Sequence, residues 1–299
     1  MRNNGERLSR QKRDSLFSPL FLFTHTIEKI EKEVKKMPVI RTDQWLDEWH
    51  DNPIGLCQHL ISYFPNASAR DIYFYLVRYG MYQPSKKIGE LIKQMKQKNI
   101  WKRVEAVYEK RKKEWNGPDV PLFLFPADSH NRKLAREFNS KGGIAFHDKL
   151  LIFLLPHHTD KEIEALVTHE YNHVCRLKKQ KKENEEVTLL DAIILEGLAE
   201  NAVCRYVGKE HQASWATYYS DEQLHRFWKR YVSPHRSILS QHPLYSRLLY
   251  GLGFYPTMLG YAVGYYIVRR CLKHGARFSR LMGIDSEQML QLAALEKNE

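Results

Sequence analysis

One stretch of seven residues, Val167-Thr-His-Glu-Tyr-Asn-His173, constrains this chain more than any other feature. It carries the pattern H-E-x-x-H in a segment that Ile163, Leu166 and Val167 predict to be an amphipathic helix. Histidines four residues apart lie on one helix face, where both imidazoles can bind a single Zn²⁺. Glu170 lies beside them, where it could take a proton from a water molecule on the metal. The pattern favours a catalytic zinc site, and a chance surface motif is the alternative.

A zinc site that uses His169 and His173 needs a third ligand. Glu196 lies in a predicted helix directly after the apolar residues 193–195. A carboxylate buried there without a partner would be costly, and a metal ion would supply the missing charge. Glu200 lies one turn further along the same face and could accept the ring N–H of a ligating histidine. The alternative for both is an ordinary solvent-facing or salt-bridged glutamate.

The remaining pattern predicts a mainly helical α+β protein with a small antiparallel sheet. Three short apolar runs predict strands at residues 120–125, 144–146 and 150–155, with a tight turn at 147–149. Residues 42–116 are predicted to be mostly helical, and Gly117-Pro118 ends that region. The helices are predicted at about 86–115, 159–178, 188–207, 221–231 and 257–273. Thr159 or Asp160 could cap the second of these helices, and Thr188 with Asp191 resembles a capping box at the start of the third.

The cysteines and the net charge narrow the class of protein. The four cysteines are scattered without a C-x-x-C pair, which argues against a disulfide scaffold or an all-cysteine zinc site and favours a reduced, cytoplasmic setting. A net charge of +12 can attract nucleic acid, anionic lipid or acidic proteins. The basic residues are spread along the chain and no nucleic-acid motif accompanies them, so we expect no specific nucleic-acid partner.

Two segments could be mistaken for membrane or targeting signals. Residues 1–36 resemble a signal peptide, but Pro19 interrupts the short apolar run. Residues 32–34 can be encoded by a bacterial ribosome-binding sequence, so we expect translation to begin at Met37; the nucleotide sequence tests this. Residues 248–268 are uncharged and long enough to cross a bilayer. Their Pro256, tyrosines and glycines favour a helix packed in the core, so no membrane span is expected.

Several motifs carry a resemblance to known metallopeptidases. H-E-x-x-H followed by E-G-x-A is similar to the gluzincins, the thermolysin and aminopeptidase type. More closely, residues of about 37–275 resemble the YjaZ-type family of predicted bacterial zinc proteases, a domain of unknown function. The matching motifs are Phe125-Pro-Ala-Asp128, Gly142-Gly-Ile-Ala-Phe-His-Asp148, His169-Glu-Tyr-Asn-His173, Leu195-Glu-Gly-Leu-Ala-Glu200 and Gly260-Tyr-Ala-Val-Gly-Tyr265.

The resemblance implies a zincin-like (gluzincin) domain and roles for its residues. One Zn²⁺ per chain would be held by His169, His173 and Glu196, with Glu200 orienting a ligand. An edge strand would pair with the substrate backbone at Gly143, Ile144, Ala145 and Phe146, where the glycines allow close approach. A tyrosine in a Y-x-x-G context would stabilise the oxyanion. Tyr261 matches that context, Tyr265 is the second candidate, and the spacing also leaves open His235, His242 and Tyr255.

Together these observations predict a zinc-dependent peptidase that acts on a peptide or protein substrate, with Glu170 as general base. A non-catalytic zinc-containing peptide-binding module and a basic nucleic-acid-associated protein are the alternatives. A binding module does not need Glu170, which separates it from the peptidase. No clear acidic anchor for a substrate amino terminus is evident, which leans toward an endopeptidase.

Four regions are expected along the chain. They are an N-terminal extension that is either not native or disordered (1–36), a helical N-terminal region (37–117), the zincin-like domain (118–275) and a C-terminal tail or helix (276–299).

Overall fold

In the computed structural model, which describes most of the chain, the protein forms two compact units. The described residues are 39–130, 142–181 and 186–295. The described part of the first unit lies within residues 39–178 and 202–213, and that of the second within 179–201 and 214–295. The predicted N-terminal extension, residues 1–36, lies outside the described residues. The boundaries expected at residues 118 and 276 stay predictions.

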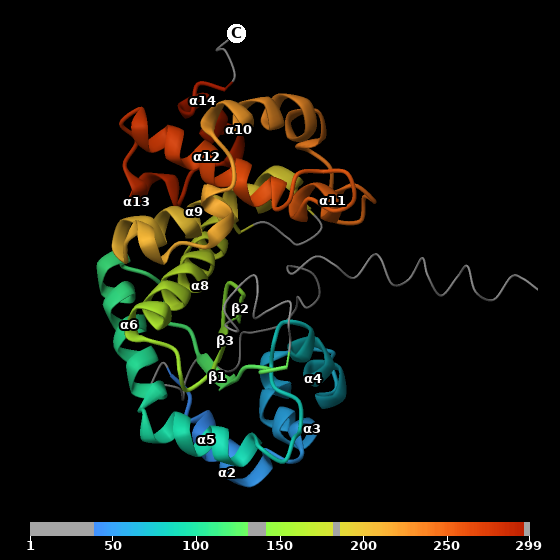
Figure 1. Cartoon of the computed structure of the whole chain (residues 1–299), viewed down its shortest axis with the longest axis vertical. Coiled ribbons are helices and arrows are strands. Elements are labelled where there is room, and N and C mark those ends of the chain that lie inside the picture. Colours follow the sequence, from blue (N-terminus) through green and yellow to red (C-terminus); the bar gives the residue numbers. More distant parts are fainter. Residues whose placement is uncertain (1–38, 131–141, 182–185, 296–299) are drawn as a thin grey trace, which may run out of the picture. The chain divides into compact units, whose positions relative to one another are not determined.

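The first unit contains a three-stranded mixed sheet (Figure 1). Its strands are β1 (Leu122–Pro126), β2 (Gly142–Ala145) and β3 (Leu150–Leu154), in the order β1-β3-β2. The expectation of an antiparallel sheet is correct for β2 and β3 but wrong for β1, which runs parallel to β3. Residues 146–149 are too short for anything but an antiparallel hairpin, whereas residues 127–149 are long enough for the crossover that parallel pairing requires.

Burial differs along the sheet. Every residue of β1 and β3 is buried, which explains why these strands are continuous apolar runs in the sequence. In β2, Ile144 is buried and its neighbours are half-exposed. Within the described residues β2 is therefore an edge strand with one side of its backbone ladder not covered by the sheet.

The other described elements of the first unit are helices (Figure 1). The helix expected at about 86–115 is two helices, α5 and α6, because Asn99 adopts a left-handed conformation with φ of 53° between them. Asparagine is among the few residues that tolerate this region, so the break is local. The helices are α2 (Thr42–Trp49), α3 (Pro53–Leu56), α4 (Ala69–Arg78), α5 (Ile88–Gln97), α6 (Ile100–Trp115), the 3₁₀ helices Cys57–Tyr63 and Lys209–His211, and α8 (Asp160–Gln180), whose last two residues belong to the second unit.

In the second unit, two helices cross with their backbones in contact. A Cβ added at Gly264 of α12 (Leu259–Lys273) would lie 1.7 Å from the carbonyl oxygen of Ile193 in α9 (Leu189–Tyr206). A Cβ added at Gly197 would lie 2.3 Å from the backbone of Gly264. Asn201 then donates to the carbonyl oxygens of Gly197 at 2.7 Å and Tyr265 at 3.1 Å. Gly197 and Gly264 thus set the positions along α9 and α12 at which the two helices cross.

The other elements of the second unit are short. Residues 248–268, the candidate membrane span, are divided between the end of α11, a loop and the start of α12. Among the described residues, no helix has both the length and the apolar character needed to cross a bilayer. The remaining elements are α10 (Asp221–Phe227), the π-helical Trp228–Val232, α11 (Tyr245–Tyr250), α13 (Phe278–Leu281), α14 (Ser286–Leu292) and the 3₁₀ helices Ser214–Thr217 and Ser233–His235.

Candidate metal centre

Helix α8 carries the H-E-x-x-H motif and begins at a well-formed cap. Thr159 and Asp160 were both candidates for that cap, and Thr159 provides it. Its backbone N–H and hydroxyl each donate to the Glu162 carboxylate at 2.9 Å, and the Glu162 N–H donates back to the Thr159 hydroxyl at 3.2 Å. Both partners satisfy groups that a helix start leaves open. The motif lies near the middle of α8, away from the fraying ends.

A buried arginine holds α8 in place next to the motif. Arg111 of α6 is 1% exposed, and its Nε donates to the Thr168 hydroxyl at 2.9 Å. Its guanidinium also donates to Glu164 at 2.8 Å, to the carbonyl oxygen of Tyr206 at 3.2 Å and to Glu114. A buried charge is tolerable when it is paired in this way. Because Thr168 directly precedes the first histidine of the motif, this contact restrains the rotation of α8.

The carboxylate of Glu164 is ionised in this network. Burial raises the pKa of Glu164, but hydrogen bonds from Lys161 and Lys110 together with their charges hold the pKa below its usual value. The arginine therefore faces a charged partner.

The position of Glu196 depends on how α9 begins and on where it crosses α12. Thr188 and Asp191 form the capping box expected from the sequence, with the Asp191 N–H donating to the Thr188 hydroxyl at 3.2 Å and the Thr188 N–H donating to the carboxylate at 3.1 Å. Glu196 directly precedes Gly197, one of the glycines at the crossing with α12. The position of Glu196 along α9 is thus set by the cap and by the crossing.

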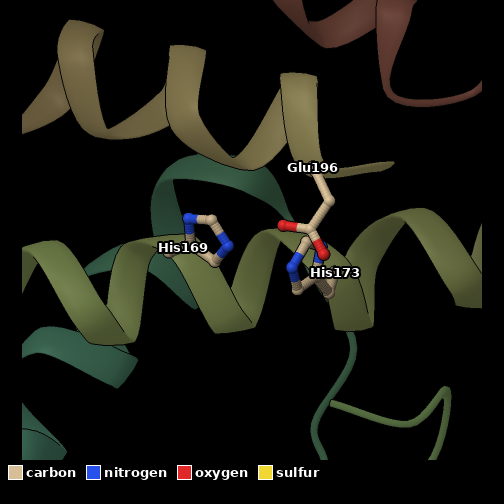
Figure 2. A group of neighbouring side chains, drawn as sticks. All are labelled: His169, His173 and Glu196. Atoms are coloured by element: carbon tan, nitrogen blue, oxygen red, sulfur yellow. The ribbon is translucent and has the colours of Figure 1, made fainter. Parts of the chain in front are cut away.

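His169, His173 and Glu196 come together as the sequence predicts. Each offers one ligand atom, and these atoms all lie within 4.8 Å of one another. Figure 2 shows the two imidazole rings and the carboxylate directed toward one another. The ring centroids are 4.7 Å apart and the planes are nearly perpendicular, at 88°. Among the described residues, these three side chains form the one group of histidine, cysteine or acidic residues that is close enough together to hold a metal ion.

The donor set fits zinc. Two imidazole nitrogens and one carboxylate oxygen form a ligand set typical of catalytic zinc sites, which keep a fourth position for water or substrate. Ligand atoms around a tetrahedral zinc lie about 3.4 Å apart, so the observed separations require small side-chain adjustments at most. The four cysteines take no part in this group, and none of them forms a disulfide.

Glu170 lies against the edge strand. A Cβ added at Gly143 of β2 would lie 2.5 Å from Cγ and Cδ of Glu170 and 2.8 Å from Oε1. Glu170 is buried, and a side chain at position 143 would occupy its place. The resemblance implies that this glycine lets the substrate backbone approach closely, and that role stays a prediction. In the structure the absence of a side chain at Gly143 also makes room for the glutamate of the motif.

The two predicted accessory residues on α9 and α12 are buried. Glu200 is 2% exposed, and Tyr261 packs against Trp215 and Tyr250 with ring centroids 5.3 and 5.8 Å away. Tyr265, the second candidate for the oxyanion, also contacts Trp215, at 6.4 Å. Their roles at the metal stay predictions.

The other oxyanion candidates make local contacts. Nδ1 of His235 lies 2.9 Å from the carbonyl oxygen of Tyr231, one turn earlier. His242 accepts a hydrogen bond from the Leu244 N–H at 3.2 Å, and the ring of Tyr255 packs on that of Tyr231. These contacts do not test the part that any of the three could play at the oxyanion, which stays a prediction.

Comparison with known proteins identifies the class to which this chain belongs. The chain is a member of the family described as "Predicted Zn-dependent protease (DUF2268)", whose model matches residues 100–291. It is similar to "Uncharacterized protein YjaZ" of Bacillus subtilis (strain 168), with 39% identity over 239 residues that cover 79% of this chain and 91% of the relative. It is also similar to "Uncharacterized protein YjfC" of the same strain, with 24% identity over 60% of this chain and 63% of the relative. No solved structure matches.

Sequence reasoning missed Arg111 and the contact between Gly143 and Glu170. Arg111 is one of many charged residues in its helix, and nothing in its local pattern marks it as buried. The one available signal was Thr168, which directly precedes His169 and faces away from the metal ligands. Its hydroxyl on that side of α8 indicated that a polar residue of another element would form a hydrogen bond with it.

Proposed function

We propose that this protein is a zinc-dependent metallopeptidase in which His169, His173 and Glu196 hold the metal and Glu170 is the general base. The convergence of three ligand atoms from two helices within 4.8 Å is the observation that carries the proposal. The family description supports the same reaction class. We further infer a zincin-like arrangement in which α8 and the edge strand β2 form the catalytic groove.

A bound Zn²⁺ would act as a Lewis acid and lower the pKa of a water molecule in its open position. The protein's own contribution is proton transfer and positioning. Glu170 takes the proton from the attacking water and delivers it to the nitrogen of the leaving amine. The buried position of Glu170 against Gly143 limits the orientations of its carboxylate, which favours transfer along one path.

The proposed substrate is an extended peptide that pairs with the outer edge of β2. Edge strands bind peptides by adding a strand, with backbone hydrogen bonds supplying affinity. Gly143 lies in β2 and touches Glu170, so a peptide on this edge would pass next to the general base. Residues 144–146 would extend the pairing. This placement suits cleavage within a chain and therefore an endopeptidase.

Tyr261 is the proposed oxyanion partner and Glu200 the proposed partner of a ligating histidine. The backbone of Gly264 lies against Gly197, the residue after Glu196, and Tyr261 is three residues from Gly264 on the same helix. The crossing therefore supports a position for Tyr261 near the middle of α9, where Glu196 lies. Glu200 follows Glu196 by one turn and is buried, so it requires a polar or charged partner.

Metal removal and replacement test the peptidase proposal. Purified full-length protein should cleave a mixed peptide library, lose that activity after chelation and regain it with stoichiometric Zn²⁺. Glu196→Gln should bind zinc at least about 100-fold more weakly because it removes a charged ligand. Glu186→Gln, at an exposed position before α9, is the matched control and should bind zinc normally.

Other outcomes lead to the alternative functions. Stoichiometric zinc with no cleavage of any library peptide would favour a non-catalytic peptide-binding module. Absence of zinc after reconstitution would dismiss the site and leave a basic protein whose affinity for nucleic acid should fall steeply with salt.

A further inference from the structure

The loop between α11 and α12 presents an apolar tip to solvent. Phe254 is fully exposed (101%) and Leu252 is 43% exposed, with only Gly253 between them. Large apolar side chains exposed together mark an interaction surface more often than chance. No other large hydrophobic side chain among the described residues approaches the exposure of Phe254.

The loop is built to hold this tip outward. Gly251 has φ of +67°, and a Cβ there would lie 1.8 Å from the carbonyl oxygen of Pro256, so only glycine fits. The Leu252 N–H donates to the Arg247 carbonyl oxygen at 2.9 Å, and the Met258 N–H donates to the Tyr250 carbonyl oxygen at 3.0 Å. The exposure of Phe254 is therefore a feature of a closed, hydrogen-bonded loop.

Aromatic and basic side chains surround the base of the tip. The guanidinium of Arg247 lies 5.7 Å from the ring centroid of Tyr255, and that ring contacts Tyr231 at 5.6 Å. The guanidinium of Arg230 lies over Tyr231 at 5.3 Å. Both tyrosines are half-buried and both arginines are exposed. Tyrosine and arginine combine an apolar body with a polar end, as required at the boundary between lipid and water.

The sequence around the tip carries charge of one sign. Residues 223–258 contain five lysines and arginines and no aspartate or glutamate. One of the five, Arg236, pairs with Glu287 of α14 at 3.1 Å. The other four basic residues of this stretch are Arg226, Lys229, Arg230 and Arg247, of which Arg230 and Arg247 lie on the tyrosines at the base of the tip.

We propose that this loop docks the protein on the surface of an anionic lipid bilayer, with Leu252 and Phe254 inserted among the lipids and Arg230 and Arg247 at the headgroups. Apolar insertion combined with a basic patch is the two-signal pattern of reversible membrane binding. A lipid surface fits because the exposed apolar residues lie beside arginine–tyrosine pairs, the combination of side chains found at a boundary between lipid and water.

Vesicle co-sedimentation of the full chain tests the proposal. We expect binding to vesicles of phosphatidylcholine mixed with phosphatidylglycerol, weak binding to phosphatidylcholine alone and release by added salt. The double variant Leu252→Ser/Phe254→Ser should bind at least about tenfold more weakly. Phe74→Ser is the matched control because Phe74 is also exposed, at 49%, but lies in α4 of the first unit; it should bind like wild type.

A second measurement reports on insertion directly. The emission of Phe254→Trp should shift to shorter wavelength with anionic vesicles and be quenched by lipids brominated in their acyl chains. Failure of the wild type to bind, equal binding of the double variant, or unquenched emission of Phe254→Trp would each overturn the proposal. Capture of an acidic protein with no binding to vesicles would assign the tip to a protein partner instead.

Discussion

Two close approaches at glycine, one in each unit, serve different purposes. In the first unit Gly143 touches the side chain of Glu170 at a distance that leaves no space for a Cβ. In the second unit Gly264 touches the backbone of α9 at Ile193, and Gly197 touches Gly264 in return. Both contacts depend on the absence of a side chain, but the first holds a chemical group and the second holds two helices together.

The difference predicts how each contact responds to change. A side chain such as Glu170 can rotate away from an added methyl group and lose its alignment while the fold survives. The carbonyl group of Ile193 is part of the α9 backbone and cannot rotate away as a side chain can. An added methyl group at Gly264 would therefore push α9 and α12 apart. Substitution at Gly143 should therefore affect turnover, and substitution at Gly264 should affect stability.

The largest effect is expected for Gly264→Ala. The added Cβ would lie 1.7 Å from the Ile193 carbonyl oxygen, so α9 and α12 must separate. We expect the free energy of unfolding to fall by about 3 kcal/mol or more. Urea denaturation measures this. Gly283→Ala is the control, because its nearest neighbour would lie at 3.8 Å. Equal stability of the two variants would show that the crossing is not tightly packed.

Gly143→Ala should have a smaller and different effect. The methyl group would displace Glu170, and we expect kcat to fall by about 10- to 100-fold with zinc content and unfolding free energy close to wild type. Steady-state hydrolysis and metal analysis of the same sample measure both quantities. If Gly143→Ala lost as much stability as Gly264→Ala, the contact at Gly143 would support the fold and not only the position of Glu170. Unchanged kcat would mean that the position of Glu170 does not depend on Gly143.

The smallest effect is expected for the tyrosines of α12. If Tyr261 stabilises the oxyanion together with the metal, Tyr261→Phe should lower kcat by about tenfold or less and leave zinc affinity unchanged. Tyr265→Phe is the matched comparison, since its ring also contacts Trp215. A larger loss for Tyr265→Phe would exchange the roles of the two tyrosines, and equal small losses would assign both to packing.

The sequence predicted the parts of the site that depend on local spacing. His169 and His173 are one helical turn apart by construction, and the isolated charge of Glu196 among apolar residues pointed to a partner. The caps at Thr188 and in the segment beginning at Thr159 were likewise readable, because a capping box spans only four residues.

The sequence did not predict features that depend on distant segments. The direction of β1 relative to β3 is set by a crossover, and periodicity within a strand contains no information about it. The burial of Arg111 and the contact between Gly143 and Glu170 arise only when separate elements pack together. The break at Asn99 was local, but the helical pattern of its neighbours outweighed it.

Glu170 is proposed to act as a base and not as a metal ligand, and the variant Glu170→Gln distinguishes these two roles. Glutamine has nearly the same size but cannot accept the proton of the attacking water. We expect one zinc per chain in this variant, as in wild type, and a loss of kcat of about 10²- to 10⁴-fold. Loss of zinc from Glu170→Gln, or retention of zinc with full activity, would contradict it.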